Sequence, residues 1–263
     1  GAAVLEMTLL GGSFEVTASG VIAIAGADME AVEERHARPL ALGRSHRVLA
    51  GEVLRFSAAV RGVRTYLALP GGIDVEPILG SRSTCLPGGF GGLDGRALAP
   101  GDVLRASRPP TEADPDHRWA TGGFDPTMET TIRIVRVSPA PGVHATAFDR
   151  LVSRAWTVSP VGDRTGARLE GDALPTTAAG EHLVSAGVLP GAIQLPASGE
   201  PIVLLADAPT IGGYPVPAVV ARADVPIIAQ RQPGEAVSFV AITLQEARLA
   251  ADARRRERVE SRS

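Results

Sequence analysis

The side chains best suited to chemistry stand just beyond apolar stretches in the second half of the chain. Asp207 follows the apolar run 202–206 and precedes Gly212, Gly213 and Tyr214. A carboxylate at a strand exit, beside two glycines, could act as a general base or contact a ligand. An Asx turn, in which the carboxylate accepts backbone N–H groups, is at least as good an explanation. Both interpretations stay open on the sequence alone.

Three further polar residues in this half could contact a substrate. Asp163 and Arg164 are adjacent in SPVGDRTG, where they could clamp a substrate or form a local ion pair that caps a turn. Gln194 lies inside the apolar stretch of PGAIQLP. A buried amide needs a hydrogen-bond partner, so Gln194 either pairs with the backbone or faces a pocket.

The first half of the chain also has a candidate substrate site, which consists of three hydroxyls around one guanidinium. Ser81, Arg82, Ser83 and Thr84 could together hold a carboxylate or a phosphate, because arginine offers a planar fork of donors. The composition favours the alternative, in which these side chains bond the backbone of their own long loop. The glycine string 88–92 is a weak candidate for a phosphate loop, since no helix start clearly follows it.

The composition excludes several kinds of chemistry. The 26 basic residues are all arginine, so no Schiff-base, P-loop or general-base lysine is available. Cys85 is the only cysteine, which excludes an internal disulfide and a zinc site built from several cysteines. The five histidines form no H-x-H or H-x-x-x-H pair, so the sequence predicts no metal site.

Charge and hydropathy narrow the expected partners and location. The net charge of -3 gives no electrostatic reason to expect nucleic acid. No apolar run approaches the roughly 20 residues that a membrane-spanning helix needs. The first residues lack the basic start of a signal peptide. We therefore expect a cytoplasmic protein that binds neither nucleic acid nor membrane.

The candidate residues must be positioned by a mainly β fold. The chain has 30 glycines and 21 prolines, and turn residues separate most of its short apolar stretches, as in barrels and sandwiches. Strands are predicted at 3–10, 13–18, 21–25, 53–58, 65–69, 103–106, 131–137, 156–159, 192–195, 202–206, 218–221 and 236–242. Short helices are predicted at 147–153, 177–185 and 226–230.

Two stretches repeat one design, which predicts two similar β domains. The first runs from TYLALPGGIDVEPILGSRST to LAPGDVL, and the second from PIVLLADAPTIGGYP to QPGEAVSF. Each ends with a glycine, an acid and a strand, and Gly51-Glu52 begins a third such unit. We expect the acid to accept a backbone N–H group in its turn. The predicted domains are 1–115 and 116–245, divided within the proline-rich and aspartate-rich stretch 108–129, and a charged helix or tail follows at 246–263.

Several motifs, in order, resemble one protein family. They are GGIDVEPILGSRST, GGLDGRALAPGD, WTVSPVGDRTGARLEG, PGAIQLP and LLADAPTIGGYPVPAVV. The chain resembles the second subunit of the bacterial proteins known as allophanate hydrolase, which is also known as the C subunit of ATP-dependent 5-oxoprolinase. That family includes the KipA-like antagonists of kinase inhibitors and the carboxyltransferase part of biotin-dependent urea carboxylase. The resemblance implies two cyclophilin-like β-barrel domains, with an N-terminal segment of the family missing from the first.

The resemblance also implies partners, cofactors and a site. A KipI-like first subunit (allophanate hydrolase subunit 1) would share a cleft with this chain, and the substrate would be a small amide or lactam. ATP would be used by the complex without firm binding to this chain, and biotin would enter only in a carboxyltransferase; no metal is implied. The catalytic residues would be Asp207, Tyr214 and Gln194, with Asp207 orienting or deprotonating the amide. The substrate would contact Ser81, Arg82, Ser83, Thr84, Asp163, Arg164, Thr210, Gly212 and Gly213.

One motif departs from the family and keeps the function open. The family text near Asp207 is similar to D-x-Q-T-T-G-G-Y-P-K, whereas this chain has Pro209, Ile211 and Val216 in place of the glutamine, the second threonine and the lysine. Thr165 also stands where methionine is common. These changes remove donors that could stabilise an oxyanion. Three functions therefore remain: a subunit of an ATP-dependent amide or lactam hydrolase, a non-catalytic KipA-type regulator, or a biotin-dependent carboxyltransferase component.

Overall fold

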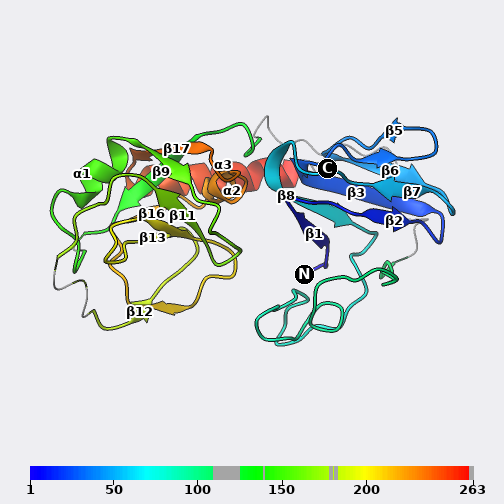
Figure 1. The fold of residues 1–263 in the computed structure, drawn as a ribbon, viewed down its shortest axis with the longest axis horizontal. Helices are drawn as coiled ribbons and strands as arrows, with labels where there is room; N and C mark the ends of the chain where they lie inside the picture. Colours follow the sequence, from blue (N-terminus) through cyan, green and yellow to red (C-terminus); the bar gives the residue numbers. More distant parts are fainter. Residues whose placement is uncertain (109–124, 139, 178–179, 181–182, 261–263) are drawn as a thin grey trace. The chain divides into compact units, whose positions relative to one another are not determined.

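The computed structural model describes residues 1–108, 125–138, 140–177, 180 and 183–260. The chain divides into two compact units, Gly1–Trp119 (unit 1) and Ala120–Ser263 (unit 2). Strands make up 34% of the chain and helices 11%, which confirms a mainly β fold with a few helices (Figure 1). Most of the predicted boundary stretch 108–129 lies outside the described residues, so the domain limits 1–115, 116–245 and 246–263 stay predictions.

Unit 1 is built from two four-stranded antiparallel sheets, drawn in blue and cyan in Figure 1. Their side chains alternate along the strands, so one face of each strand meets the core. The core includes Ile24, Met29, Leu40, Phe56 and Leu67. One sheet has the order β1 (Leu5–Thr8), β8 (Arg61–Ala68), β3 (Gly20–Asp28) and β6 (Arg44–Val48), and the other has β2 (Ser13–Glu15), β7 (Val53–Arg55), β4 (Val32–Glu33) and β5 (Arg38–Pro39).

Unit 2 is a closed barrel of seven strands. Neighbours pair antiparallel, except that β17 runs parallel to β9. The interior is apolar, with Ile134, Trp156, Leu169, Ile193 and Val203 all buried. The order around the barrel is β10 (Ala155–Val158), β11 (Gly166–Glu170), β14 (Ile202–Leu204), β13 (Ala192–Gln194), β16 (Ala218–Val220), β9 (Thr131–Arg136) and β17 (Ala236–Ala241). A separate two-stranded ribbon joins β12 (Ala186–Gly187) to β15 (Ile211–Gly212).

Among its described residues, unit 2 also has three α-helices. α1 (Ala147–Val152) packs into the core, and its Leu151 carbonyl accepts the Trp156 indole N–H at 3.0 Å. α2 (Val225–Ala229) follows Asp224, whose buried carboxylate binds the Arg133 guanidinium at 2.8 and 2.6 Å. α3 (Leu244–Glu260) begins with a reciprocal capping box between Thr243 and Glu246. Within the described ranges, no helix combines the length and the apolar character that crossing a bilayer requires.

The predicted elements are largely confirmed, and the errors have physical reasons. The predicted strand 103–106 is wrong, because only Ala106 forms a bridge there, with Ile73. The strands β6 and β11 escape prediction because their sequences, RSHRV and GARLE, are rich in polar residues. The helices predicted at 147–153 and 226–230 are present within a residue of those limits. The helix predicted at 177–185 lies partly outside the described residues.

The three glycine-acid turns adopt one common design, as the sequence predicts. They span 49–52, 99–102 and 232–235, each with a positive φ at its glycine. In each turn the carboxylate of the last residue accepts the N–H of the first, at 2.9, 2.7 and 2.6 Å respectively. An arginine lies beside each acid, in the pairs Arg38–Glu52, Arg96–Asp102 and Arg231–Glu235. The repeat therefore extends to side-chain contacts as well as to sequence.

Candidate functional site

The structure joins Arg164 and Asp207, two residues that are far apart in the sequence. Arg164 precedes β11 and Asp207 follows β14, and these strands pair antiparallel, which brings the two residues to one edge of the barrel. The guanidinium donates to both carboxylate oxygens, from Nε at 2.7 Å and from Nη2 at 3.1 Å. The Asp207 N–H also donates to the Arg164 carbonyl at 2.9 Å. Because both oxygens already accept charge-assisted bonds, Asp207 is better suited to orienting a group than to removing a proton.

Asp163 has the local, turn-capping role that the sequence offered as one alternative. Its Oδ1 accepts the N–H groups of Thr165 at 2.7 Å and Gly166 at 3.3 Å. Both acceptor contacts stabilise the turn that leads into β11. Asp163 therefore fixes the backbone from which Arg164 reaches Asp207.

Gln194 is the most unusual polar side chain of unit 2. Ile193 and Leu195 point into the barrel core, so Gln194 between them points to the opposite face of the strand. It is only 5% exposed. In the part of the chain that the structure describes, no hydrogen bond joins its carboxamide to another residue. The carboxamide is not among the described polar atoms that are both fully buried and without a partner, so it keeps contact with solvent and has a donor and an acceptor to offer to a ligand.

Gly212 of the β12–β15 ribbon lies directly against this carboxamide. A Cβ atom added at Gly212 would collide with Nε2 of Gln194 and press on Val188 at 3.3 Å. Glycine is required here for close approach of the backbone, since its φ is not in the left-handed region. The ribbon therefore approaches the Gln194 carboxamide closely with backbone at Gly212, where no side chain would fit.

The remaining predicted residues of this half gather around the same ribbon. The carbonyl of Thr210 accepts the Val188 N–H at 3.0 Å, and a Cβ at Gly213 would lie 3.4 Å from the Ser185 hydroxyl. Tyr214 follows β15 and is half exposed. The structure thus forms two groups in unit 2: Gln194 with the ribbon, and Arg164 with Asp207.

Strand β14 separates these two groups. Ile202, at its start, pairs with Gln194, whereas Asp207 lies beyond its last residue, Leu204. The chain from Asp207 then leads back to the ribbon at Ile211, so one short loop connects both groups.

The predicted cluster of unit 1 is occupied with its own backbone. Arg82 donates from Nε to the Val75 carbonyl at 3.0 Å and from Nη1 to the Gly1 carbonyl at 3.2 Å. The Ser81 hydroxyl accepts the Ser83 N–H at 3.1 Å. Thr84 packs so closely on Gly92 that a Cβ there would collide with its Oγ1. These contacts correspond to the loop-bonding alternative, and substrate binding by Ser81–Thr84 stays a prediction.

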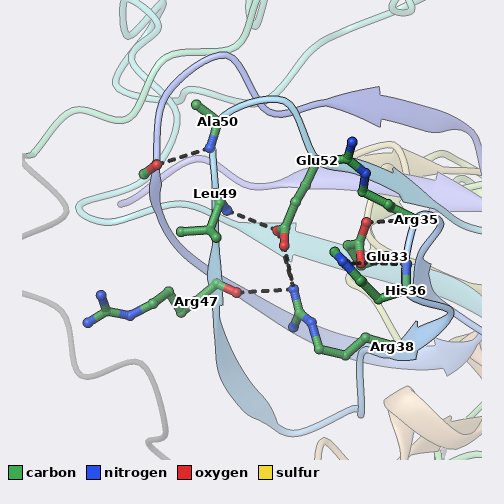
Figure 2. Close-up of polar contacts among 9 residues, drawn as sticks. Glu33, Arg35, His36, Arg38, Arg47, Leu49, Ala50 and Glu52 are labelled. Atoms are coloured by element: carbon green, nitrogen blue, oxygen red, sulfur yellow. Dashed lines mark hydrogen bonds and ion pairs between the residues drawn. The ribbon is translucent and has the colours of Figure 1, made fainter.

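One cluster of metal-ligand residue types in the described chain was not predicted. Glu33, His36 and Glu52 of unit 1 place one ligand atom each within 4.8 Å of one another (Figure 2). The spacing E-x-x-H at positions 33–36 is the available signal in the sequence, but it contains one histidine and therefore no histidine pair. Glu33 is fully buried, and its Oε2 lies 2.9 Å from His36 Nδ1.

The carboxylates of this cluster already have hydrogen-bond donors. Glu33 accepts the N–H groups of Arg35 at 2.9 Å and His36 at 3.1 Å. Glu52 accepts the Leu49 N–H and the Arg38 guanidinium. Burial alone would raise the pKa of Glu33, but the bonds from His36 and the backbone outweigh it and lower the pKa below its usual value. We therefore assign these carboxylates structural roles: Glu33 holds the turn between β4 and β5, and Glu52 binds Arg38 of β5 from the turn before β7 (Figure 2).

Comparison with known proteins identifies the family. The family model for the carboxyltransferase domain, subdomain A and B, matches residues 1–241. The chain belongs to this family. It is 38% identical over 251 residues to the C subunit of 5-oxoprolinase from Escherichia coli, covering 92% of this chain and 76% of that protein. It is 29% identical over 272 residues to urea amidolyase of Lachancea kluyveri, of which it covers 14%.

Solved structures of this carboxyltransferase-domain family share the fold. The crystal structure of TTHA0988 superposes with a TM-score of 0.79 at 32% identity, covering 91% of this chain and 45% of that one. The Kluyveromyces lactis urea carboxylase superposes with a TM-score of 0.84 at 27% identity, covering 96% of this chain and 24% of that one. This chain therefore spans less than half of either solved chain.

Proposed function

We propose that this chain is the second subunit of an ATP-dependent enzyme that cleaves a small amide or lactam, of the 5-oxoprolinase type. The observation that carries the proposal is its 38% identity to the C subunit of 5-oxoprolinase along 92% of its length. A KipI-like first subunit would complete the cleft, and the complex would use ATP without firm binding of the nucleotide to this chain. We place the complex in the cytoplasm, where ATP is available.

The Gln194 carboxamide supports an amide or lactam as the substrate class. Its NH2 group can donate to the substrate carbonyl, and its oxygen can accept the substrate N–H, so the two amides pair through two hydrogen bonds. As the carbonyl carbon is attacked, its oxygen becomes negative and the same donor strengthens its bond. A donor that stabilises such an oxygen typically contributes a factor of about 10² to 10³ in rate.

The neighbouring residues have supporting roles in this proposal. Gly212 provides the close backbone approach that holds the Gln194 carboxamide in one orientation. Asp207, held by Arg164, would orient the substrate or an attacking group through its carboxylate. The Tyr214 hydroxyl, half exposed after β15, would give its proton to the leaving nitrogen.

The test is reconstitution with the natural partner subunits. The purified chain is mixed with the KipI-like first subunit and the lactam-activating subunit from the same organism, with ATP and 5-oxoproline. We expect glutamate release that requires every component, and urea and allophanate are run in parallel as competing substrates. Glutamate release at the same rate without this chain would contradict the proposal, as would turnover of urea alone.

A biotin-dependent carboxyltransferase component is the second candidate. It is favoured by the family description and by the similarity to urea amidolyase. In that case biotin on a separate carrier protein would deliver the carboxyl group, since this chain has no lysine to carry it. Urea-dependent consumption of carboxybiotin by the chain and its first subunit would favour this candidate over lactam cleavage.

A non-catalytic KipA-type regulator is the third candidate. It is favoured by Pro209, Ile211 and Val216, which offer no side-chain donors in the loop that leads to the ribbon. This candidate predicts that the KipI-like partner still binds when Arg82 and Asp207 are both changed to alanine. It also predicts that no amide is turned over by the wild-type complex.

A further inference from the structure

The turn at 78–81 in unit 1 carries an unusual residue at its tip. Ile78 and Ser81 exchange two backbone hydrogen bonds, at 2.8 and 2.9 Å. Between them Leu79 has φ 51° and Gly80 has φ 78°. Positive φ at both central positions is the pattern of the two-residue hairpin turn that prefers Asn-Gly or Asp-Gly. Leucine has neither the short polar side chain nor the missing Cβ that makes this conformation cheap.

The folded chain offers no compensation for this strained leucine. Leu79 is 93% exposed, so its isobutyl group gains almost nothing from burial within unit 1. A left-handed, fully exposed leucine is unfavourable in both conformation and hydration. Such an outlier in a folded protein motivates a functional explanation.

The base of the turn is held rigidly by the residues that follow it. The Arg82 guanidinium bonds the carbonyls of Val75 and Gly1, and the Ser81 hydroxyl accepts the Ser83 N–H. The backbone of the turn is therefore fixed, and Leu79 stands at its exposed tip, before any partner arrives. Presenting a residue in a fixed conformation reduces the entropy lost on binding.

We infer that Leu79 is a docking residue that inserts into an apolar pocket of the KipI-like first subunit. The inference rests on the proposed function, which supplies the partner. Two relatives support a protein as the partner. The Escherichia coli relative is named as one subunit of an enzyme, and in TTHA0988 the matching region makes up 45% of a longer chain. The same glycine-rich segment exposes further apolar side chains, namely Ile78, Leu86 and Phe90. Exposed apolar side chains gathered in one segment are typical of an interaction surface.

Leu79→Asn separates docking from folding. Asparagine tolerates the left-handed conformation, so the melting temperature of the free chain should stay the same or rise by a few degrees. The apolar anchor is lost, so affinity for the first subunit should fall by at least about tenfold. The matched control is Leu10→Asn, since Leu10 is also strongly exposed in unit 1 but has an ordinary φ. The control should leave the affinity within about twofold of wild type.

The measurement is the dissociation constant between the purified chain and the first subunit from the same organism, by calorimetry. Equal binding by wild type and Leu79→Asn would overturn the inference and leave the proposed function intact. A melting temperature lowered by Leu79→Asn would also overturn it, because Leu79 would then act in folding. If the wild-type chain does not bind the first subunit at all, the proposed function fails and the inference fails with it.

Discussion

The glycine-rich loop of unit 1 and the loop from Asp207 to Tyr214 in unit 2 use similar residues differently. In unit 1 the Arg82 guanidinium bonds carbonyls of nearby backbone, and the serines bond within their own turn. In unit 2 the Arg164 guanidinium crosses to a carboxylate on another strand. On the other side of strand β14, the carboxamide of Gln194 forms no hydrogen bond within the described residues. The first loop therefore bonds backbone with its polar groups, whereas the second borders the side chains to which our proposal assigns the substrate.

In our proposal, the segment that carries the family resemblance most clearly differs from the segment that carries the chemistry. The motif LGSRST carries the family resemblance, yet its Arg82 guanidinium and Ser81 hydroxyl bond backbone groups. The unit 2 loop departs from the family text at Pro209, Ile211 and Val216, yet it leads to Gly212, which lies against the Gln194 carboxamide. The departures affect side chains on the loop and leave Gln194, Gly212 and Asp207 in place.

The largest expected effect is on catalysis by Gln194→Leu. The side chain has nearly the same volume, so the free energy of unfolding should change by less than about 1.5 kcal/mol. Loss of the donor should lower kcat of the reconstituted complex by about 10² to 10³. Arg82→Ala is the control substitution in the unit 1 loop, and it should leave kcat of the reconstituted complex within about threefold of the wild-type value. Equal losses of kcat from both variants would remove the distinction between the two loops.

Next in size is the effect of Gly212→Ala. The new methyl group collides with Nε2 of Gln194, which must turn away from its present orientation. A displacement of this kind can lower the rate by about 10². Gly92→Ala is the control, because it creates a similar collision with Thr84 in the unit 1 loop. The control should lower the melting temperature of the chain and leave kcat of the folded enzyme unchanged. A loss of kcat from Gly92→Ala, with kcat unchanged in Gly212→Ala, would contradict the catalytic role that we propose for Gln194.

A smaller effect is expected from Asp207→Asn. The pair with Arg164 is substantially exposed, at 43% for Asp207 and 34% for Arg164, so its loss should change stability by at most about 1 kcal/mol. If the carboxylate orients the substrate, kcat/KM should fall by about tenfold or more. Chemical denaturation and steady-state kinetics measure the two effects. A large loss of stability with unchanged kcat/KM would show that the pair serves only the fold.

The sequence predicted the local contacts of these loops better than the long-range ones. The turn acids Glu52, Asp102 and Glu235 bond backbone as expected, because the geometry depends only on four consecutive residues. The contact between Arg164 and Asp207 depends on the pairing of β11 with β14, and β11 was not recognised as a strand. Its sequence GARLE has too few apolar residues to indicate a strand without its neighbours.

Besides strand pairing, the sequence does not show which polar side chains are buried. Gln194 interrupts an apolar run, which predicts either a backbone partner or a pocket, and the sequence does not show how deeply the side chain is buried. The cluster of Glu33 and His36 gave no such signal, since a buried glutamate in a polar stretch is not distinguishable from an exposed one. Only the pairing of β4 with β7 shows that Glu33 faces inward.

The smallest expected effect is that of Asp102→Asn, at the end of the unit 1 loop, on the melting temperature as a function of pH. The hydrogen bonds from Arg96, and then the N–H of Ala99, lower the pKa of Asp102 from 3.8 to about 2. The folded pKa is the lower one, so the ionised carboxylate stabilises the chain above pH 3.8, and this contribution is lost as the pH falls toward about 2. Asp102→Asn should therefore lower the melting temperature slightly at neutral pH, and the difference from wild type should vanish across that window. A constant difference at all pH values would indicate that charge is not involved.

A crystal structure of the complete complex with bound 5-oxoproline tests the central claim most directly. Our account predicts that the lactam carbonyl and N–H lie within hydrogen-bond distance of the Gln194 carboxamide, next to Gly212. It also predicts that Arg82 keeps its bonds to the carbonyls of Val75 and Gly1. A lactam held by Ser81–Thr84, with the Gln194 carboxamide facing no ligand atom, would contradict the account.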